Sequence, residues 1–338
     1  MSTIPTMIMF HTQFYGYVRY FAKAGIRHSF LLSNKSNDLG AEQTFSGTGE
    51  LTDLSGGKTE LKDMEPETEL SFYRATLGLT GGAEWNTKVN KALHAHYVRN
   101  SVTVEDGDLH TICELAKANK IAVYLGIIER PLDRGGHSVY ASLVYINEKG
   151  EIKSVHRKLQ PTYDERLTWA PGDGNGLQVH PLKDFTVGGL NCWENWMPLP
   201  RAALYGLGEN LHIAVWPGSD HNTKDITRFI ARESRSFVIS VSSLMSKNDF
   251  PKDTPHLDEI LVKAPDVLAN GGSCIAGPDG EWIVEPVLHK HGLIIETIDF
   301  NSVYEERQNF DAVGHYSRPD VTQLHVNRER QTTVKFNK

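Results

Sequence analysis

The sequence predicts an α/β fold with sheets inside and helices outside, and three observations lead to this class. From residue 81 onward, segments with the helical spacing of apolar residues alternate with short β-branched runs. Tight turns separate several neighbouring strand-like runs, which predicts hairpins within the sheets. The chain has 338 residues, 39% of them hydrophobic, which is enough for one large domain or two ordinary ones around a sizeable core.

Two helices are expected between residues 85 and 116. In the first, apolar side chains recur at helical spacing, namely at Trp85, Val89, Ala92, Leu93 and Tyr97. The same periodicity over residues 109–116 predicts the second helix. Cys113 lies on the apolar face of this second helix, so we expect it in the core.

The predicted strands follow these helices along the chain. Residues 121–127 and 138–146 are apolar and β-branched, and the turn at 147–150 leads into a further strand at 152–157. Lys158 directly follows the second strand of that hairpin. The remaining predicted elements are helices at 200–207 and 225–235, and strands at 211–216, 237–241, 271–276, 282–287 and 293–298.

The first 75 or so residues depart from this pattern. Residues 33–69 are polar, bury little apolar surface and are predicted to form an extended surface loop or a disordered segment. So long a stretch without structure is unusual inside a compact domain. We therefore expect an atypical N-terminal segment, residues 1–75, and a folded domain, residues 76–338.

Composition excludes several classes of protein. A formal net charge of −7 argues against nucleic acid as a partner. No apolar run approaches the roughly 18 residues that a membrane helix needs, and no secretory signal is evident. The three cysteines, Cys113, Cys192 and Cys274, are widely spaced, which favours free thiols in a reducing cytoplasm over disulfides or a zinc site. The histidines lack partners at metal-ligand spacing, so no metal is expected.

The run from Thr186 to Asn191 is the stretch in which we expect the chemistry to be centred. It is apolar, contains two glycines that permit close approach of other backbone, and ends abruptly at Cys192. This pattern predicts a strand followed by a sharp turn that presents a thiol, which becomes a nucleophile when its pKa is lowered. The plainer interpretation is a buried structural cysteine. Cys274, inside an apolar strand, is interpreted as core.

Two motifs together resemble a known family. Cys192-Trp193-Glu194-Asn195 is followed by Met197-Pro198-Leu199, and upstream stand His156-Arg157-Lys158 and Glu165-Arg166. This combination resembles the nitrilase branch of the carbon–nitrogen hydrolases, over about residues 81–327. The resemblance implies a four-layer α-β-β-α sandwich, with residues 76–338 as the carbon–nitrogen hydrolase domain. It also implies a Glu–Lys–Cys triad, with Cys192 as the nucleophile, Lys158 as the triad lysine and Glu165 as a second, supporting glutamate.

The site residues also have plainer interpretations. Glu165 alone would be a surface salt bridge to Arg166 or Arg157, and Lys158 alone a solvated lysine at a strand end. Trp193 is expected to be a core aromatic residue beside the pocket. Glu194 is expected to orient the backbone around the thiol.

The triad base is not assigned by the sequence. The family places this glutamate in a Phe-Pro-Glu motif after a strand, and the chain has no such motif. By position the nearest candidate is Glu60, with Glu50, Glu65 and Glu67 also in range. None of them follows an apolar strand, which rigid placement needs.

The resemblance implies a nitrilase that converts a small-molecule nitrile into a carboxylic acid and ammonia, through a cysteine thioimidate and acyl-enzyme, without a cofactor. An amidase, or a hydratase-type activity by the same thiol, is one alternative. The other is an impaired member that serves as an assembly or binding protein, because the base motif is missing. Relatives form dimers that stack into larger spirals, so a homo-oligomer is expected, with interface contacts around residues 314–327.

Overall fold

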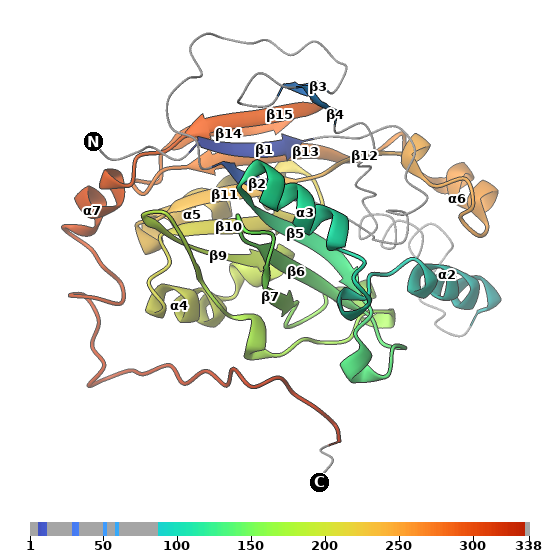
Figure 1. The fold of residues 1–338 in the computed structure, drawn as a ribbon, viewed down its shortest axis with the longest axis horizontal. Helices are drawn as coiled ribbons and strands as arrows, with labels where there is room; N and C mark the ends of the chain where they lie inside the picture. The colour runs from blue at the N-terminus through green and yellow to red at the C-terminus, as the bar shows by residue number, and fades with distance from the viewer. Residues whose placement is uncertain (1–5, 12–28, 34–49, 53–57, 61–86, 335–338) are drawn as a thin grey trace.

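A computed structural model describes residues 6–11, 29–33, 50–52, 58–60 and 87–334 of the chain. Two large sheets dominate these residues (Figure 1). The first has the order β15 (Gly292–Thr297), β1 (Thr6–His11), β2 (Ser29–Ser33), β5 (Ile121–Glu129), β6 (Tyr140–Ile146) and β7 (Ile152–Arg157). The second has the order β12 (Leu244–Ser246), β13 (Val267–Ala276), β11 (Phe237–Ser242), β10 (Leu211–Trp216), β9 (Phe185–Asn191) and β8 (His180–Leu182), with β14 (Trp282–Leu288) paired to β13.

The two sheets differ in how their strands pair. Every pair in the first sheet is antiparallel, and β7 forms one edge beside β6. In the second sheet β9, β10 and β11 run parallel, while β8 and β13 flank them antiparallel. The carboxyl end of a parallel strand is where α/β folds usually present functional groups. Strand β9 ends at Asn191, so Cys192 leaves the sheet at such an end.

The main core lies between the two sheets. Tyr124 and Leu143 from the first sheet pack in one cluster with Val187, Ile213 and residues of β11 and β13 from the second. Burial of this apolar surface is the principal force that holds the sheets face to face.

Helices cover the outer faces of both sheets. Helix α3 (His110–Asn119) buries Ile112 and Ala116 against the first sheet, and α5 (Lys224–Ser234) buries Ile226 and Ile230 against β10 and β11. The other helices are α2 (Lys88–Arg99), α4 (Pro198–Gly206), α6 (Leu257–Lys263) and α7 (Asn301–Arg307). The predicted α/β sandwich, with helices outside two packed sheets, is therefore confirmed.

Most predicted elements lie within a few residues of their observed bounds. The predicted strands at 152–157 and 211–216 coincide with β7 and β10. The N-terminal segment, expected to be atypical, contains two short apolar runs, residues 7–10 and 28–32, which lie in β1 and β2. Strand β1 lies between β2 and the late strand β15. Within the polar stretch 33–69, β3 (Glu50–Thr52) and β4 (Lys58–Glu60) form a two-stranded sheet. Apart from Ser33, which ends β2, the other residues of that stretch lie outside the described part.

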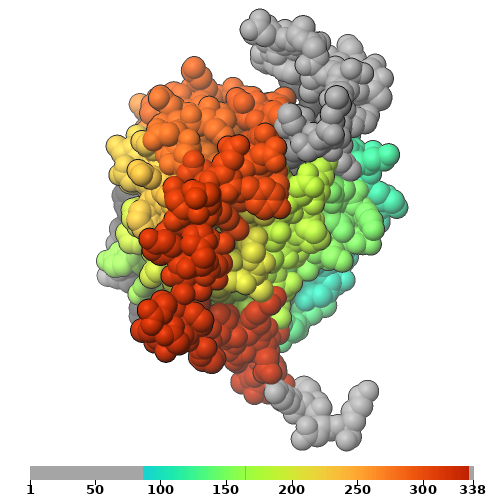
Figure 2. Space-filling view, turned by 90° about the vertical axis from the view of Figure 1, so that its left-hand side faces the viewer, coloured from blue at the N-terminus to red at the C-terminus, as the bar shows by residue number. Residues whose placement is uncertain are grey.

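The C-terminal segment runs from α7 along the surface, coloured red in Figure 2. Its far end is fastened to the turn that contains Asp173: Arg330 Nη1 and the Gln331 N–H both donate to this buried carboxylate, each at 2.9 Å. Arg330 also donates to the carbonyl of Val155 on β7. Among the described residues, no helix is long and apolar enough to cross a membrane.

Candidate active site

The last two residues of β7 and the residue that follows it each pair with a different buried glutamate. The pairs are His156 with Glu194, Arg157 with Glu129, and Lys158 with Glu165. All six side chains are buried. A buried charge is costly unless it is paired and hydrogen-bonded, so these carboxylates fix the end of β7 firmly.

Lys158 and Glu165 form the tightest of these pairs. Lys158 Nζ lies 2.6 Å from Glu165 Oε2, with exposed side-chain fractions of 1% and 0%. Lys158 Nζ also donates to Thr162 Oγ1 at 3.2 Å. The plainer interpretations, a surface salt bridge for Glu165 and a solvated Lys158, are wrong.

The loop after Lys158 holds Glu165 in place by a local device. A 3-10 helix, Tyr163–Leu167, begins after Thr162, and the Glu165 carboxylate reaches back to accept from the Thr162 N–H at 2.6 Å. This return bond is the carboxylate half of a capping box. The same Oε2 atom therefore accepts from both the loop backbone and Lys158 Nζ.

Cys192 lies on the sharp turn that follows β9. A 3-10 helix, Cys192–Trp196, begins directly at the strand end, and the φ of Cys192 is +59°. A non-glycine residue in the left-handed region is strained and persists where surrounding contacts hold it. Asn195 Nδ2 supplies two such contacts, donating to the carbonyls of Cys192 at 2.9 Å and of Leu190 at 3.2 Å. The Cys192 side chain is fully buried.

Glu194 connects the Cys192 turn to the strand that bears Lys158. Its Oε2 accepts from the Asn191 N–H at 3.0 Å, and its Oε1 accepts from the Leu159 N–H at 2.6 Å. One carboxylate thus binds the backbone immediately before Cys192 and immediately after Lys158. This is the backbone-orienting role expected for Glu194, and it extends to a second element.

The charge of Glu194 is stabilised although the side chain is buried. Burial alone would raise the pKa of this carboxyl, but the charge and hydrogen bond of His156 and the N–H groups of Leu159 and Asn191 lower it below its ordinary value. His156 Nε2 lies 3.1–3.2 Å from both carboxylate oxygens. The link therefore consists of charge-assisted hydrogen bonds, which are roughly twice as strong as neutral ones.

Arg157 anchors the opposite side of the same strand end. Its guanidinium binds Glu129 through two hydrogen bonds of 2.8 and 2.9 Å, binds Asp133, and lies 4.7 Å from the centre of the Tyr140 ring. Burial would lower the pKa of Arg157, but the bonds to Glu129 and Asp133 raise it above the ordinary value. Arg157 therefore keeps its charge and fixes the backbone next to Lys158.

Comparisons with known proteins show the family to which the chain belongs. The family model described as carbon–nitrogen hydrolase matches residues 65–308. The chain belongs to the carbon–nitrogen hydrolase family. It is 35% identical over 256 residues to Nitrilase 2 from an unknown prokaryotic organism, covering 75% of this chain and 79% of the relative. It is 34% identical over 243 residues to Nitrilase 2 of Arabidopsis thaliana, covering 71% and 70%.

A solved structure shows the same fold. The carbon–nitrogen hydrolase from Helicobacter pylori G27 matches 61% of this chain and 71% of its own length, with a TM-score of 0.50 and 18% identity. The predicted membership of the family and the predicted nitrilase-like α/β sandwich are both confirmed.

In this hydrolase the predicted site residues lie on two connected elements. Lys158 and Glu165 are in direct contact, and Glu194 joins their strand to the Cys192 turn. Among the described residues, no hydrogen bond joins Cys192 Sγ to Lys158 or Glu165. Trp193 is 56% exposed, which corrects the expectation of a core aromatic residue: in the tight 3-10 turn its side chain points outward while those of Cys192 and Glu194 point inward.

The carboxylate candidates from the early chain are only partly described. Glu60 ends β4 and lies opposite Glu50 on β3, in a two-stranded sheet that pairs with neither large sheet in the described residues. Glu65 and Glu67 lie outside the described part of the chain. A triad base among these four residues stays a prediction.

The sequence predicts no role for four further residues of the hydrolase site, although two of them, His156 and Asn195, belong to its motifs. His156, Asn195, His212 and Glu209 all take part in buried hydrogen bonds around the two elements. For Glu165 and Glu194, whose roles the sequence does predict, a second signal is present: Thr162 and Glu165, and likewise Asn191 and Glu194, have the three-residue offset of a capping box.

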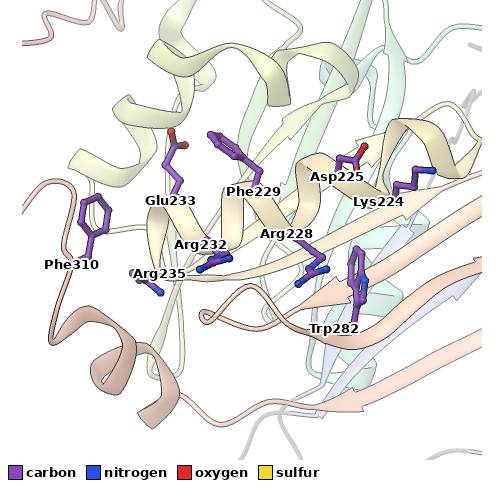
Figure 3. Close-up of a pocket in the computed structure, with 9 residues that line it drawn as sticks. All are labelled: Lys224, Asp225, Arg228, Phe229, Arg232, Glu233, Arg235, Trp282 and Phe310. Atoms are coloured by element: carbon purple, nitrogen blue, oxygen red, sulfur yellow. The ribbon is translucent and has the colours of Figure 1, made fainter.

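A separate hollow of about 900 Å³ lies along α5 on the outside of the hydrolase (Figure 3). Arginines of α5, Trp282 and Phe310 line it, and none of the predicted site residues does. Glu233, at the end of this hollow, binds Arg201 Nε at 2.9 Å. Arg201 in turn donates to the Asn195 carbonyl at 2.7 Å, so the outer helix supports the Cys192 turn from behind.

Proposed function

We propose that this carbon–nitrogen hydrolase is a nitrilase, with Cys192 as the nucleophile, Lys158 as the catalytic ammonium and Glu165 as its supporting carboxylate. The observation that carries the proposal is the buried contact of 2.6 Å between Lys158 and Glu165, joined by Glu194 to the turn that bears Cys192. The two relatives, both named nitrilases, support nitriles as the substrate class.

The first half of the reaction forms a covalent thioimidate. The Cys192 thiolate attacks the nitrile carbon, a C–S bond forms, and one π pair of the C≡N bond moves to nitrogen. The Lys158 ammonium gives a proton to that nitrogen and stabilises the charge that develops there. A lysine buried beside Glu165 supplies this proton from a fixed position.

The second half consumes two water molecules. The first adds to the thioimidate carbon, ammonia leaves after proton transfer to nitrogen, and a thioester remains. The second water attacks the thioester, the C–S bond breaks, and the carboxylic acid and the thiol are released. The balance is one nitrile and two waters giving one acid and one ammonia. A positioned proton-transfer group contributes typically about 10²–10⁴-fold to such steps.

A carboxylate has to accept the protons of the thiol and the waters. In the described part of the chain, Glu165 is the carboxylate in contact with Lys158, and its Oε1 is buried without a hydrogen-bond partner there. This oxygen supports a role for Glu165 in proton transfer. A separate base near Glu60 remains part of the proposal as expected from the family pattern.

Ammonia release from matched substrates tests this function. Wild type should release ammonia and acid from a nitrile, whereas C192A and K158M should not. C113A serves as the control. Cys113 is a half-buried thiol on α3 and packs against the apolar cluster between this helix and the first sheet. Faster ammonia release from the matching amide than from the nitrile would instead support the amidase, and amide as the product would support hydratase-type activity.

Iodoacetamide labelling separates an enzyme from a catalytically silent assembly protein. The proposal expects rapid modification of Cys192 that a nitrile protects against, with slow modification of Cys113 and Cys274. Burial raises the pKa of Cys274 to about 11 and raises that of Cys113, so both are poor thiolates. Equal, slow labelling of all three thiols would contradict the nucleophile.

We also propose self-association and a cytoplasmic location. Exposed apolar side chains on the C-terminal segment support contacts with a second copy, namely Val313, Tyr316, Val321, Leu324 and Val326. Three free thiols support a reducing compartment. Sedimentation of the full chain at several concentrations tests the first point: a monomer throughout would contradict it.

A further inference from the structure

A buried chain of hydrogen bonds runs behind the Cys192 turn. Asn195 Oδ1 lies 2.8 Å from His212 Nε2 on β10, and His212 Nδ1 lies 2.9 Å from Glu209 Oε1. All three side chains are fully buried. The proposed reaction uses none of them, so their polar groups require another explanation.

The direction of each bond in this chain follows from chemistry. The Nδ2 group of Asn195 donates to two carbonyls, so its oxygen is the atom that faces His212. His212 Nε2 must therefore carry a hydrogen. Its Nδ1 faces a carboxyl, so one proton is shared between His212 and Glu209, either as an ion pair or as a neutral pair.

The surroundings of Glu209 hold this pair closely. A Cβ at Gly188 on β9 would lie 2.2 Å from Glu209 Oε1, so glycine leaves the room the carboxyl occupies. Burial raises the pKa of the Tyr124 and Tyr205 hydroxyl groups and lowers that of the Arg307 guanidinium, and nearby Glu209 adds a smaller upward effect to each. Arg307 Nη2 also donates to the Glu209 carbonyl at 2.7 Å.

We propose that His212 is a positioning residue for the Cys192 turn and acts through the side chain of Asn195. Its Nε2–H orients the Asn195 amide, and that amide holds the carbonyl of Cys192 in the left-handed conformation that aims the thiol. Glu209 fixes the ring in turn. The inference rests on the proposed role of Cys192 as the nucleophile, but the geometry of the turn is measurable without turnover.

Two amide substitutions of His212 distinguish a loss of the hydrogen bond to Asn195 from a loss of packing. The amide nitrogen of H212Q occupies roughly the place of Nε2 and keeps a donor toward Asn195, whereas H212N reproduces the Nδ1 side and faces Glu209. In the full-length protein, H212N should lower kcat on the order of 10²-fold with KM little changed, while H212Q retains most of kcat. In the double variant with N195A, H212N should add little further loss, since both act through one contact.

Hydrogen–deuterium exchange of the peptide 190–197 measures directly how firmly the backbone of the Cys192 turn is held. H212N should exchange faster there than wild type and H212Q, and H180Q serves as the control because His180 is buried but contacts Ser154 and Tyr145 instead. If H212N does not fold, N195A replaces it in the experiment. Exchange in residues 190–197 of N195A should then be faster than in wild type, while β10 stays protected. Equal behaviour of H212N and H212Q, or unchanged exchange in N195A, would overturn the inference. Absence of nitrile turnover in wild type would contradict the proposed function only. The exchange measurement would still test whether His212 positions the Cys192 turn.

Discussion

The Lys158 ammonium and the Glu165 carboxylate lie 2.6 Å apart, and neither side chain reaches solvent. Taking either charge out of water is costly unless the other remains beside it. The same pair therefore serves two ends: it holds the loop after β7, and it places a proton donor where the proposed reaction needs one.

Removal of Lys158 should destabilise the protein and abolish activity together. K158M leaves Glu165 buried without its partner, which costs about 3–5 kcal/mol of unfolding free energy. The double variant K158M/E165M should recover part of that stability because no unpaired charge remains, although the Thr162 N–H loses its acceptor. Urea unfolding measures both. Activity should be absent from both variants, and a double variant that recovers turnover would show that the pair is only structural.

Glu194 should matter more to stability at neutral pH than in acid. In E194Q one backbone N–H, of Leu159 or Asn191, loses its acceptor, at a cost of about 1.5–3 kcal/mol. The folded-state pKa of Glu194 is lowered from the ordinary 4.5, so its stabilisation is complete above pH 4.5 and is lost as pH falls through the lower folded value. The gap between wild type and E194Q should therefore shrink below pH 4.5.

Exposed Glu151 is the control for that experiment. Its carboxylate also pairs with neighbours, Asn147 and Lys153, but at the surface, where such bonds contribute little. E151Q should leave the unfolding curve unchanged at neutral pH. A gap for E194Q that stays constant from pH 7 to pH 3 would contradict a stabilising negative charge on Glu194.

Gly188 on β9 and Gly206 on α4 allow a controlled test of packing, because an added Cβ is crowded at the first and free at the second. G188A directs a Cβ into the Glu209 carboxyl, which is itself held by His212, so we expect a loss of about 1–3 kcal/mol. A Cβ at Gly206, the last residue of α4, meets nothing within 4 Å, and G206A should gain about 0.4–1 kcal/mol because alanine restricts the unfolded chain. Thermal unfolding distinguishes them, and a neutral G188A would mean that Glu209 moves freely.

His180 should make the protein less stable as pH falls toward 4. Burial, with a smaller effect of Lys153, lowers the pKa of His180 from 6.5 to about 4. The unfolded chain takes up a proton between these values that the folded chain does not, so unfolding free energy falls as pH drops from 6.5 to 4. H180Q should remove that slope. Unfolding curves at intervals of half a pH unit check it, and an identical slope in H180Q would refute it.

Local patterns predicted the elements that local contacts define. Strand β7 was predicted with its observed bounds because a turn precedes it and β6 pairs with it in a hairpin. Strand β1 was not assigned because its partner β15 comes from the far end of the chain, and no local pattern encodes that pairing.

The site shows the same division between local and distant contacts. Lys158, Glu165 and Glu194 belong to the short motifs that carry the family resemblance, and the capping-box offsets of Glu165 and Glu194 are readable in the sequence. His212 lies in an apolar strand, and its partner Asn195 belongs to another element. Only the folded arrangement shows that this histidine supports the Cys192 turn.

Mass spectrometry of the protein and of its peptides, quenched during nitrile turnover, tests whether Cys192 forms the covalent intermediate. We expect a thioimidate or acyl adduct on the peptide that contains Cys192, absent in C192A and accumulating little in K158M. Hydrolysis of the nitrile by C192A, or an adduct found on Cys113 or Cys274 instead, would contradict it.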